Sequence, residues 1–253
     1  MKCAIILAAG RPHFGKEPSI FFKQNKYFSN LDILKDMLKN YTKKITLVTG
    51  YNDLAIKKKK LNIKLIKNSK WDNTKSLYSL LSVDLSKNKE ILIIYSDIIF
   101  NKEILEKLIL SKQEITIVIS KEKINFKKNK EYLNLKKNTI IDIGSNLSKQ
   151  NTKAEFVGLV KLRGKSLNFL TKLKKEKNRL KNLKISDLMK ILIKKKYSYK
   201  LLDVQNNWIE IKNNLENVRK HIISTKANTL AFAKKYLKKS IVLPQYTFSI
   251  NEW

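Results

Sequence analysis

The stretch KCAIILAAG, residues Lys2–Gly10, decides the fold of this chain. Its apolar part, Cys3–Leu7, is long enough for one buried strand and too short for a core helix. It leads into Ala8, Ala9 and Gly10, whose small side chains allow backbone N–H groups to approach a ligand closely. We therefore predict a buried first strand that opens into a phosphate-binding loop. An ordinary strand and turn explains the same residues about as well, because the spacing matches neither the dinucleotide nor the P-loop glycine pattern.

Strands and helices alternate along the chain beyond this first strand. Apolar runs at 45–48, 63–65, 91–95, 115–119, 155–162 and 198–203 predict strands, and helical spacing predicts helices at 30–38, 74–84, 102–110, 166–175, 185–193 and 215–223. Asn30 is the expected cap of the first helix. Two short polar-bounded strands, Tyr132–Leu135 and Thr139–Ile143, predict an inserted β-hairpin. The pattern predicts an α/β fold, a three-layer sandwich around a mostly parallel mixed sheet.

The chain divides by composition into two parts. We expect residues 1–223 to form the α/β domain and residues 224–253 to form a C-terminal extension. The extension ends on Phe248, Ile250 and Trp253, and these apolar side chains require a surface on which to pack. That surface belongs either to this domain or to a partner protein.

The formal net charge of +33 would ordinarily indicate binding to nucleic acid. However, 50 of the 54 basic residues are lysines, and they are spread along the chain instead of forming one arm. Base recognition relies on arginine forks and interleaved aromatic side chains, and this sequence has neither pattern. We therefore expect no nucleic-acid partner, and we expect the positive charge to attract small anionic substrates.

Cys3 is the only cysteine and lies within the first predicted strand, so the sequence offers no disulfide framework. With His13 and His221 as the only histidines, a zinc site of histidine and cysteine ligands cannot be assembled. The apolar N-terminal run is too short for a signal peptide, and no stretch approaches membrane-spanning length. These features favour a cytoplasmic protein without a membrane partner.

Two acidic residues are candidates for metal binding. Asp97 follows the most apolar strand, at the position where open α/β sheets place ligand-binding groups. Mg²⁺ is the natural partner of such a carboxylate, because it takes one or two carboxylates and completes its shell with phosphate oxygens and water. Glu210, on a short apolar strand after Trp208, is the second candidate. The alternatives are a helix cap for Asp97 and a solvent-facing edge position for Glu210.

The segment Asn68–Leu77 concentrates amide and hydroxyl groups between a predicted strand and a predicted helix. Such groups can hydrogen-bond a base or a ribose, but clusters of Asn, Asp and Ser also form ordinary turns and caps.

Taken in order, several short motifs resemble those of the nucleoside triphosphate transferases, and the phosphocholine cytidylyltransferase branch in particular. The motifs are LAAG at 7–10, VTGY at 48–51, DNTKSL at 72–77, SD at 96–97, AEFVG at 154–158 and WIEI at 208–211. The resemblance covers roughly residues 2–220. It implies the Rossmann-like nucleotidyltransferase fold and a CTP-dependent transferase activity that uses Mg²⁺.

The resemblance also implies roles for individual residues. The nucleotide would be held by Leu7, Ala8, Ala9, Gly10, Asn73 and Ser76, and Mg²⁺ by Asp97 with Glu210. The family's Pro-Lys pair reads Pro18-Ser19 here, so Arg11, Lys16 and Lys23 become the expected phosphate cations. Where the family commonly ends its late motif on an aspartate, this chain has Lys212.

Two stretches of the extension, 224–230 and 243–253, resemble the opening of a kinase module related to phosphoenolpyruvate synthase. Such modules accompany cytidylyltransferases in capsule synthesis, and the combination resembles the CTP:phosphoglutamine cytidylyltransferases of capsular phosphoramidate biosynthesis. The implied reaction transfers CMP from CTP to a small phosphorylated acceptor, L-glutamine phosphate in this branch, with a kinase as possible partner. Phosphocholine or a sugar 1-phosphate as acceptor, and a non-catalytic partner of a kinase, are the alternatives.

Overall fold

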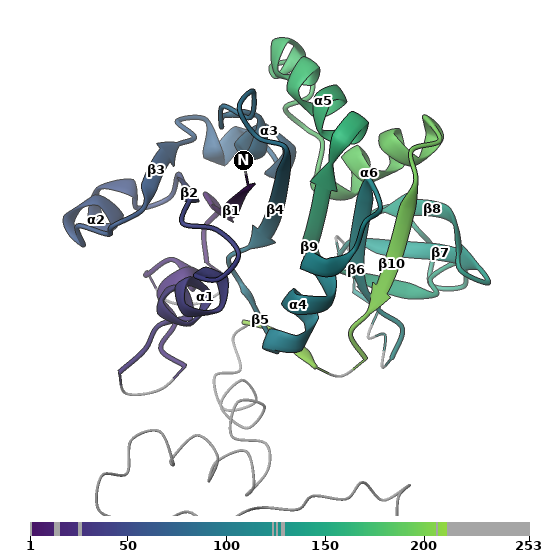
Figure 1. Cartoon of the computed structure of the whole chain (residues 1–253), viewed down its shortest axis with the longest axis horizontal. Coiled ribbons are helices and arrows are strands. Elements are labelled where there is room, and N and C mark those ends of the chain that lie inside the picture. The colour runs from purple at the N-terminus through teal and green to yellow at the C-terminus, as the bar shows by residue number, and fades with distance from the viewer. Residues whose placement is uncertain are drawn as a thin grey trace, which may run out of the picture.

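The computed structural model describes residues 2–12, 16–24, 27–122, 124, 126–127, 130–205 and 207–211. Nine strands form one sheet, and seven of them follow the order β10-β6-β9-β4-β1-β2-β3 (Figure 1). Their bounds are β1 Lys2–Ala8, β2 Ile45–Thr49, β3 Lys64–Lys67, β4 Glu90–Tyr95, β6 Ile115–Ser120, β9 Ala154–Arg163 and β10 Tyr199–Asp203. Strand β9 runs antiparallel to β4 and β6, whereas the other neighbours on this path are parallel.

Helices cover both faces of the sheet, which confirms the three-layer sandwich. Their bounds are α1 Asn30–Leu38, α2 Asp53–Lys58, α3 Ser76–Leu81, α4 Lys102–Leu110, α5 Gly164–Leu173 and α6 Ile185–Lys194. Short 3₁₀ turns lie at Ser19–Phe21, Trp71–Asn73 and Lys174–Glu176. Most predicted helices and strands are present, although α3 ends three residues earlier than its apolar spacing predicts.

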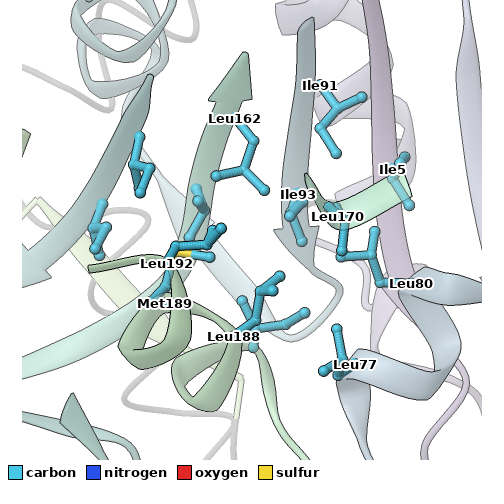
Figure 2. Packing of buried hydrophobic residues seen from close by; sticks show 14 of the residues in the cluster. Ile5, Leu77, Leu80, Ile91, Ile93, Leu162, Leu170, Leu188, Met189 and Leu192 are labelled. Atoms are coloured by element: carbon cyan, nitrogen blue, oxygen red, sulfur yellow. The ribbon is translucent and has the colours of Figure 1, made fainter. Parts of the chain in front are cut away.

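The side chains of β1 alternate between two apolar cores, because successive residues of a strand point to opposite faces of the sheet. Ile5 and Leu7 pack in one core with helices α3, α5 and α6, as Figure 2 shows for Ile5, Leu80 and Leu188. Ala4 and Ile6 pack in the other core with α1, α2 and α4. A strand buried on both faces explains why residues 3–7 read as one continuous apolar run.

The predicted hairpin is formed by β7 (Tyr132–Lys136) and β8 (Thr139–Gly144). Strand β7 also pairs with the beginning of β9, so the hairpin extends the sheet. A second, two-stranded sheet joins β5 (Ile98–Phe100) to β11 (Trp208–Glu210). This pairing links segments more than a hundred residues apart in the sequence. It places the WIEI motif, residues 208–211, beside the segment that follows β4.

The cap of α1 differs from the expectation. Asn30 is the first residue of the helix, and Ser29 is the cap, with its hydroxyl accepting from the backbone N–H of Asp32. The Asp32 carboxylate accepts in return from the N–H of Ser29, which completes a capping box. Asn30 is therefore available for another role.

Residues 212–253, which include Lys212 and the whole C-terminal extension, lie outside the described part of the chain. The boundary at 223 and the kinase-like tail stay predictions. Among the described residues, no helix is both long and apolar enough to cross a bilayer.

Candidate active site

Strand order places a candidate site between β1 and β4. The chain runs from β1 outward to β2 and β3, and then returns to the other side of β1 as β4. Ligands of open α/β sheets bind outside the carboxyl ends of the strands at such a reversal of direction. Leu7 pairs with Tyr95, and the N–H of Ser96 donates to the carbonyl of Leu7 at 3.2 Å. The loop that follows Ala8 and the turn that carries Asp97 therefore leave the sheet side by side.

The small-residue loop after β1 has open space beside Gly10 among the described residues. A Cβ atom added at Gly10 would meet no atom of the described residues within 4 Å, its chain neighbours Ala9 and Arg11 left aside. The neighbouring Ala9 is buried, and its carbonyl accepts from the N–H of Tyr51 at 2.8 Å. Arg11 is exposed, and its guanidinium carbon lies 5.5 Å from the centre of the Tyr51 ring. The loop is thus fixed by β2 at its base.

A close contact explains Gly50 in the second motif. A Cβ atom at Gly50 would lie 2.5 Å from the Trp71 Cβ and 2.6 Å from the Ala9 carbonyl oxygen, closer than real Cβ contacts allow. Trp71 therefore packs directly on the β2 end, and its ring meets that of Tyr51 edge to face at 5.5 Å. The turn that contains Asn73 is brought next to the Ala9 and Gly10 loop in this way.

The two nucleotide-binding candidates of the Asn68–Leu77 segment have different surroundings. Asn73 is exposed at the end of its 3₁₀ turn. Ser76 is the first residue of α3, where its hydroxyl lies 3.2 Å from the Tyr95 hydroxyl and accepts from the N–H of Ile185 at 3.0 Å. Ser76 thus joins α3 to β4 and α6, a role that sequence reasoning missed.

The backbones of the Asp97 turn and of β11 lie side by side. Glu210 pairs with Ile98, and the N–H of Ile211 donates to the Asp97 carbonyl at 2.6 Å. The cap of α4 is at Asn101, so the alternative in which Asp97 caps that helix is wrong. The short strand β5 that creates this pairing was not predicted, because three residues carry too little periodicity to recognise.

Glu210 is already paired in the structure. Its Oε2 lies 3.0 Å from the Lys130 ammonium, which also contacts Glu155 at the beginning of β9. The same ammonium lies 5.9 Å from the centre of the Trp208 ring. A metal-binding role for Glu210 would require this ion pair to open.

The donor set suits Mg²⁺ when a triphosphate is bound. Among the described residues, no group of three or more acidic, histidine or cysteine side chains could hold a metal alone. Mg²⁺ does not need such a cage, because it commonly binds through one or two carboxylates together with substrate phosphates and water. Asp97 would supply the carboxylate, and both Asp97 and Glu210 stay predicted ligands.

The three cationic candidates are placed differently. Arg11 lies at the loop itself, as described above. Lys16 lines a cavity of about 180 Å³ beside α2, and its carbonyl accepts from the side chain of Asn52. Lys23 is exposed in a bridge with Ser29, close to the beginning of α1. Arg11 thus lies against the Tyr51 ring, whereas Lys16 and Lys23 lie at separate places in the segment that leads to α1.

A carboxylate that sequence reasoning missed lies on the β9 side of the site. The Tyr95 hydroxyl donates to Glu131 Oε2 at 3.0 Å, and Glu131 Oε1 accepts from the N–H of Ser186 at 3.1 Å. Glu131 keeps part of its surface exposed, yet burial of its carboxylate raises its pKa. Burial also raises the pKa of Tyr95, and the neighbouring Glu131 charge adds to that shift.

Gly158 allows Tyr95 to take this position. Its φ of +87° is unfavourable for other residues, and an added Cβ would lie 2.5 Å from the Tyr95 ring. The glycine of the AEFVG motif therefore has a structural explanation: the Tyr95 ring packs directly on the β9 backbone.

No known family model matches this sequence, and no curated protein matches it in sequence. Solved structures match in fold. The inositol-1-phosphate CTP transferase from T. maritima is 19% identical with a TM-score of 0.66, and the match covers 87% of this chain and 95% of that protein. This chain has the nucleotidyltransferase fold. The CTP:phosphocholine cytidylyltransferase from Streptococcus pneumoniae, also 19% identical, matches with a TM-score of 0.62 over 88% of this chain and 99% of that one.

A putative glucose-1-phosphate thymidylyltransferase from Bacillus anthracis gives a TM-score of 0.66 at 15% identity, over 87% of this chain and 94% of that protein. At these levels of identity the likeness shows the fold alone. Each of the three structures is matched over nearly its whole length, so the shared fold extends over most of this chain.

Proposed function

We propose that this chain is a nucleotidyltransferase that transfers CMP from CTP to a small phosphorylated acceptor and releases pyrophosphate. The observation that carries the proposal is the pairing of β1 with β4, which places the open Ala8–Gly10 loop beside the Asp97 turn. Two of the similar structures are CTP-dependent transferases, and this supports CTP as the nucleotide.

The reaction is an in-line substitution at phosphorus. An oxygen of the acceptor phosphate attacks the α-phosphorus of CTP, a new phosphoanhydride bond forms, and the bond to the β-phosphate breaks as pyrophosphate departs. The nucleophile is already anionic, so no general base is required. Bound at Asp97, Mg²⁺ would supply positive charge to the triphosphate. Catalysis by the chain then consists of positioning the two reactants and neutralising the charge on phosphate.

The residues divide this work between them. Backbone N–H groups of the Ala8, Ala9 and Gly10 loop bind phosphate oxygens, and Arg11 adds a cation at the mouth of the loop. Asp97 would hold the metal ion, and Asn73 offers an amide to the nucleoside. Lys16 and Lys23 are further candidates for the triphosphate, carried by the segment between the loop and α1.

Within this class we propose L-glutamine phosphate as the acceptor to test first, with CDP-L-glutamine as the product in capsular phosphoramidate synthesis. The motif order of the chain and the kinase-like tail at 224–253 support this choice. The same tail is the reason to propose a kinase as partner. Phosphocholine and sugar 1-phosphates are the alternative acceptors.

The test is pyrophosphate release by the purified chain with CTP and Mg²⁺ and each acceptor in turn. We expect turnover with L-glutamine phosphate and none without an acceptor. Turnover with only phosphocholine or a sugar 1-phosphate would overturn L-glutamine phosphate as the acceptor and would still support the transferase activity. Absence of turnover with all acceptors, together with no effect of CTP and Mg²⁺ on thermal unfolding, would indicate a non-catalytic protein.

A further inference from the structure

The Asp97 turn is held by one buried side-chain amide from a distant part of the sequence. Asn30, at the beginning of α1, has 1% of its surface exposed. Its Nδ2 donates to the carbonyl of Ser96 at 3.2 Å and to the carbonyl of Ile98 at 3.1 Å. These are the residues immediately before and after Asp97, so one amide fixes the backbone on both sides of the proposed metal-binding carboxylate.

A second amide fixes the orientation of the first. Gln24 Nε2 donates to Asn30 Oδ1 at 2.8 Å. The carbonyls of Ser96 and Ile98 can only accept, so the NH₂ group of Asn30 must face them and its oxygen must face Gln24. The backbone N–H of Asn30 donates to the Phe22 carbonyl at 2.8 Å, which ties the same residue to the segment that carries Lys23.

Helix formation does not explain this asparagine. The N-terminus of α1 is already capped by Ser29 and Asp32, so the Asn30 side chain is not required as a cap. Asn30 is buried at the beginning of a helix whose Leu31 and Leu34 belong to the apolar core, and an apolar side chain at this position would avoid the cost of burying an amide. The polar side chain is accounted for by its two bonds to the Asp97 turn.

We propose that Asn30 is a positioning residue for Asp97, and that Gln24 supports it by fixing the orientation of its amide. Asn30 sets the position of the carboxylate through the two flanking carbonyls and itself touches neither metal nor nucleotide. The same two residues connect the segment that carries Lys23 to the Asp97 turn. This inference rests on the proposed function.

The test measures Mn²⁺ binding in the presence of CTP by electron paramagnetic resonance, which reports on the metal directly and does not require turnover. Loss of groups that position a metal ligand typically weakens metal binding by about 10–100-fold. We expect Asn30→Ala to raise the Mn²⁺ dissociation constant by about that factor. Gln24→Leu should raise it by a smaller factor, because the Asn30 amide loses its anchor but keeps its donors.

A matched control removes a buried hydrogen bond at the opposite end of the sheet. Thr116 is fully buried, and its hydroxyl donates to that of Ser111 at 2.7 Å. Thr116→Val should lower the urea midpoint and leave the Mn²⁺ constant unchanged. The kinetic counterpart is the Mg²⁺ concentration for half-maximal turnover, which should rise in the Asn30 and Gln24 variants and stay constant in the control.

An unchanged Mn²⁺ constant in folded Asn30→Ala and in Gln24→Leu would overturn the positioning role. If Asn30→Ala does not fold, Gln24→Leu decides alone, and a constant equal to that of the wild type refutes the proposal. Failure of the wild-type chain to bind Mn²⁺ with CTP would instead contradict the proposed function, so the two failures are distinguishable.

Discussion

The two ends of β4 bear ionisable groups in contrasting surroundings. At the amino end, Glu90 accepts from the Tyr41 hydroxyl at 2.7 Å and lies 3.5 Å from the ammonium of Lys161. That ammonium also donates to the carbonyls of Ile109 and Ser111, each at 2.6 Å. At the carboxyl end, Glu131 takes its direct hydrogen bonds from neutral groups, the Tyr95 hydroxyl and a backbone N–H.

The difference separates a structural network from a candidate site. At the amino end, the Glu90 carboxylate is paired with the fully buried Lys161 ammonium, and this contact accounts for the burial of both groups. The carboxyl end has an open loop at Gly10, a carboxylate turn at Asp97 and a Glu131 carboxyl group whose pKa is raised by burial. Groups in such surroundings concentrate at functional sites. Substitutions at the two ends should therefore separate activity from stability.

The largest expected effect is loss of activity at the carboxyl end. Asp97→Ala should lower turnover by at least about 10²–10³-fold, the range found when a single charge-stabilising group is removed from an active site. Its unfolding midpoint in urea should stay close to that of the wild type. Full pyrophosphate release by this variant would show that Asp97 is not the metal ligand.

The next effect is loss of stability at the amino end. Lys161 is 1% exposed, and truncating one member of a buried ion pair typically costs about 3–5 kcal/mol of unfolding free energy. We expect Lys161→Ala to show this loss in urea titration and to keep its turnover per folded molecule. Lys161→Met, which retains most of the volume, separates packing from charge. Lost turnover in a folded Lys161 variant would contradict the division between the two ends.

A smaller effect is expected from crowding at the end of β2. The Cβ of Gly50→Ala would displace both Trp71 and the Ala9 carbonyl. Overpacking of this kind costs about 1–3 kcal/mol of unfolding free energy. The control is Gly10→Ala. The added Cβ would have open space among the described residues, so this variant should keep the unfolding free energy of the wild type while binding CTP more weakly. Calorimetric titration with CTP and Mg²⁺ measures the second effect. Unchanged CTP binding by Gly10→Ala would remove the loop from the phosphate site.

The smallest effect concerns Glu131 and depends on pH. Its folded-state pKa is raised above the unfolded value, so the folded protein binds more protons between the two values and loses stability as pH rises through that interval. Glu131→Gln imitates the protonated form. The variant should be more stable than the wild type at neutral pH, and the difference should disappear in acid. Thermal unfolding across pH 3–8 tests this, and a difference independent of pH would refute the assignment.

The sequence predicts the sheet well because its strands are buried on both faces and read as continuous apolar runs. The strands at 3–7 and 91–95 could be predicted in this way. The ends of these two strands then gave the positions of the Ala8–Gly10 loop and of Asp97. The antiparallel β9 was expected only within a mixed sheet, since periodicity does not give strand direction.

The sequence predicts the polar contacts poorly because they depend on distant partners. Asparagine is a residue type typical of helix caps, yet the Asn30 amide donates a hydrogen bond to the carbonyl of Ser96, 66 residues away in the sequence. Glu131 carried no local signal, and its role follows from Tyr95 and Ser186. Lys130 is one lysine among fifty in sequence, and only the fold shows that it bridges Glu155 and Glu210.

The most direct test of the central claim compares the thermal unfolding of the wild-type chain and of Asp97→Asn, each with CTP, with Mg²⁺ and with both. Ligands that bind the folded state raise its unfolding temperature. We expect a clear rise for the wild type only when CTP and Mg²⁺ are present together, and little or none for Asp97→Asn. An equal rise in both proteins, or no rise in the wild type, would contradict a nucleotide site between β1 and β4.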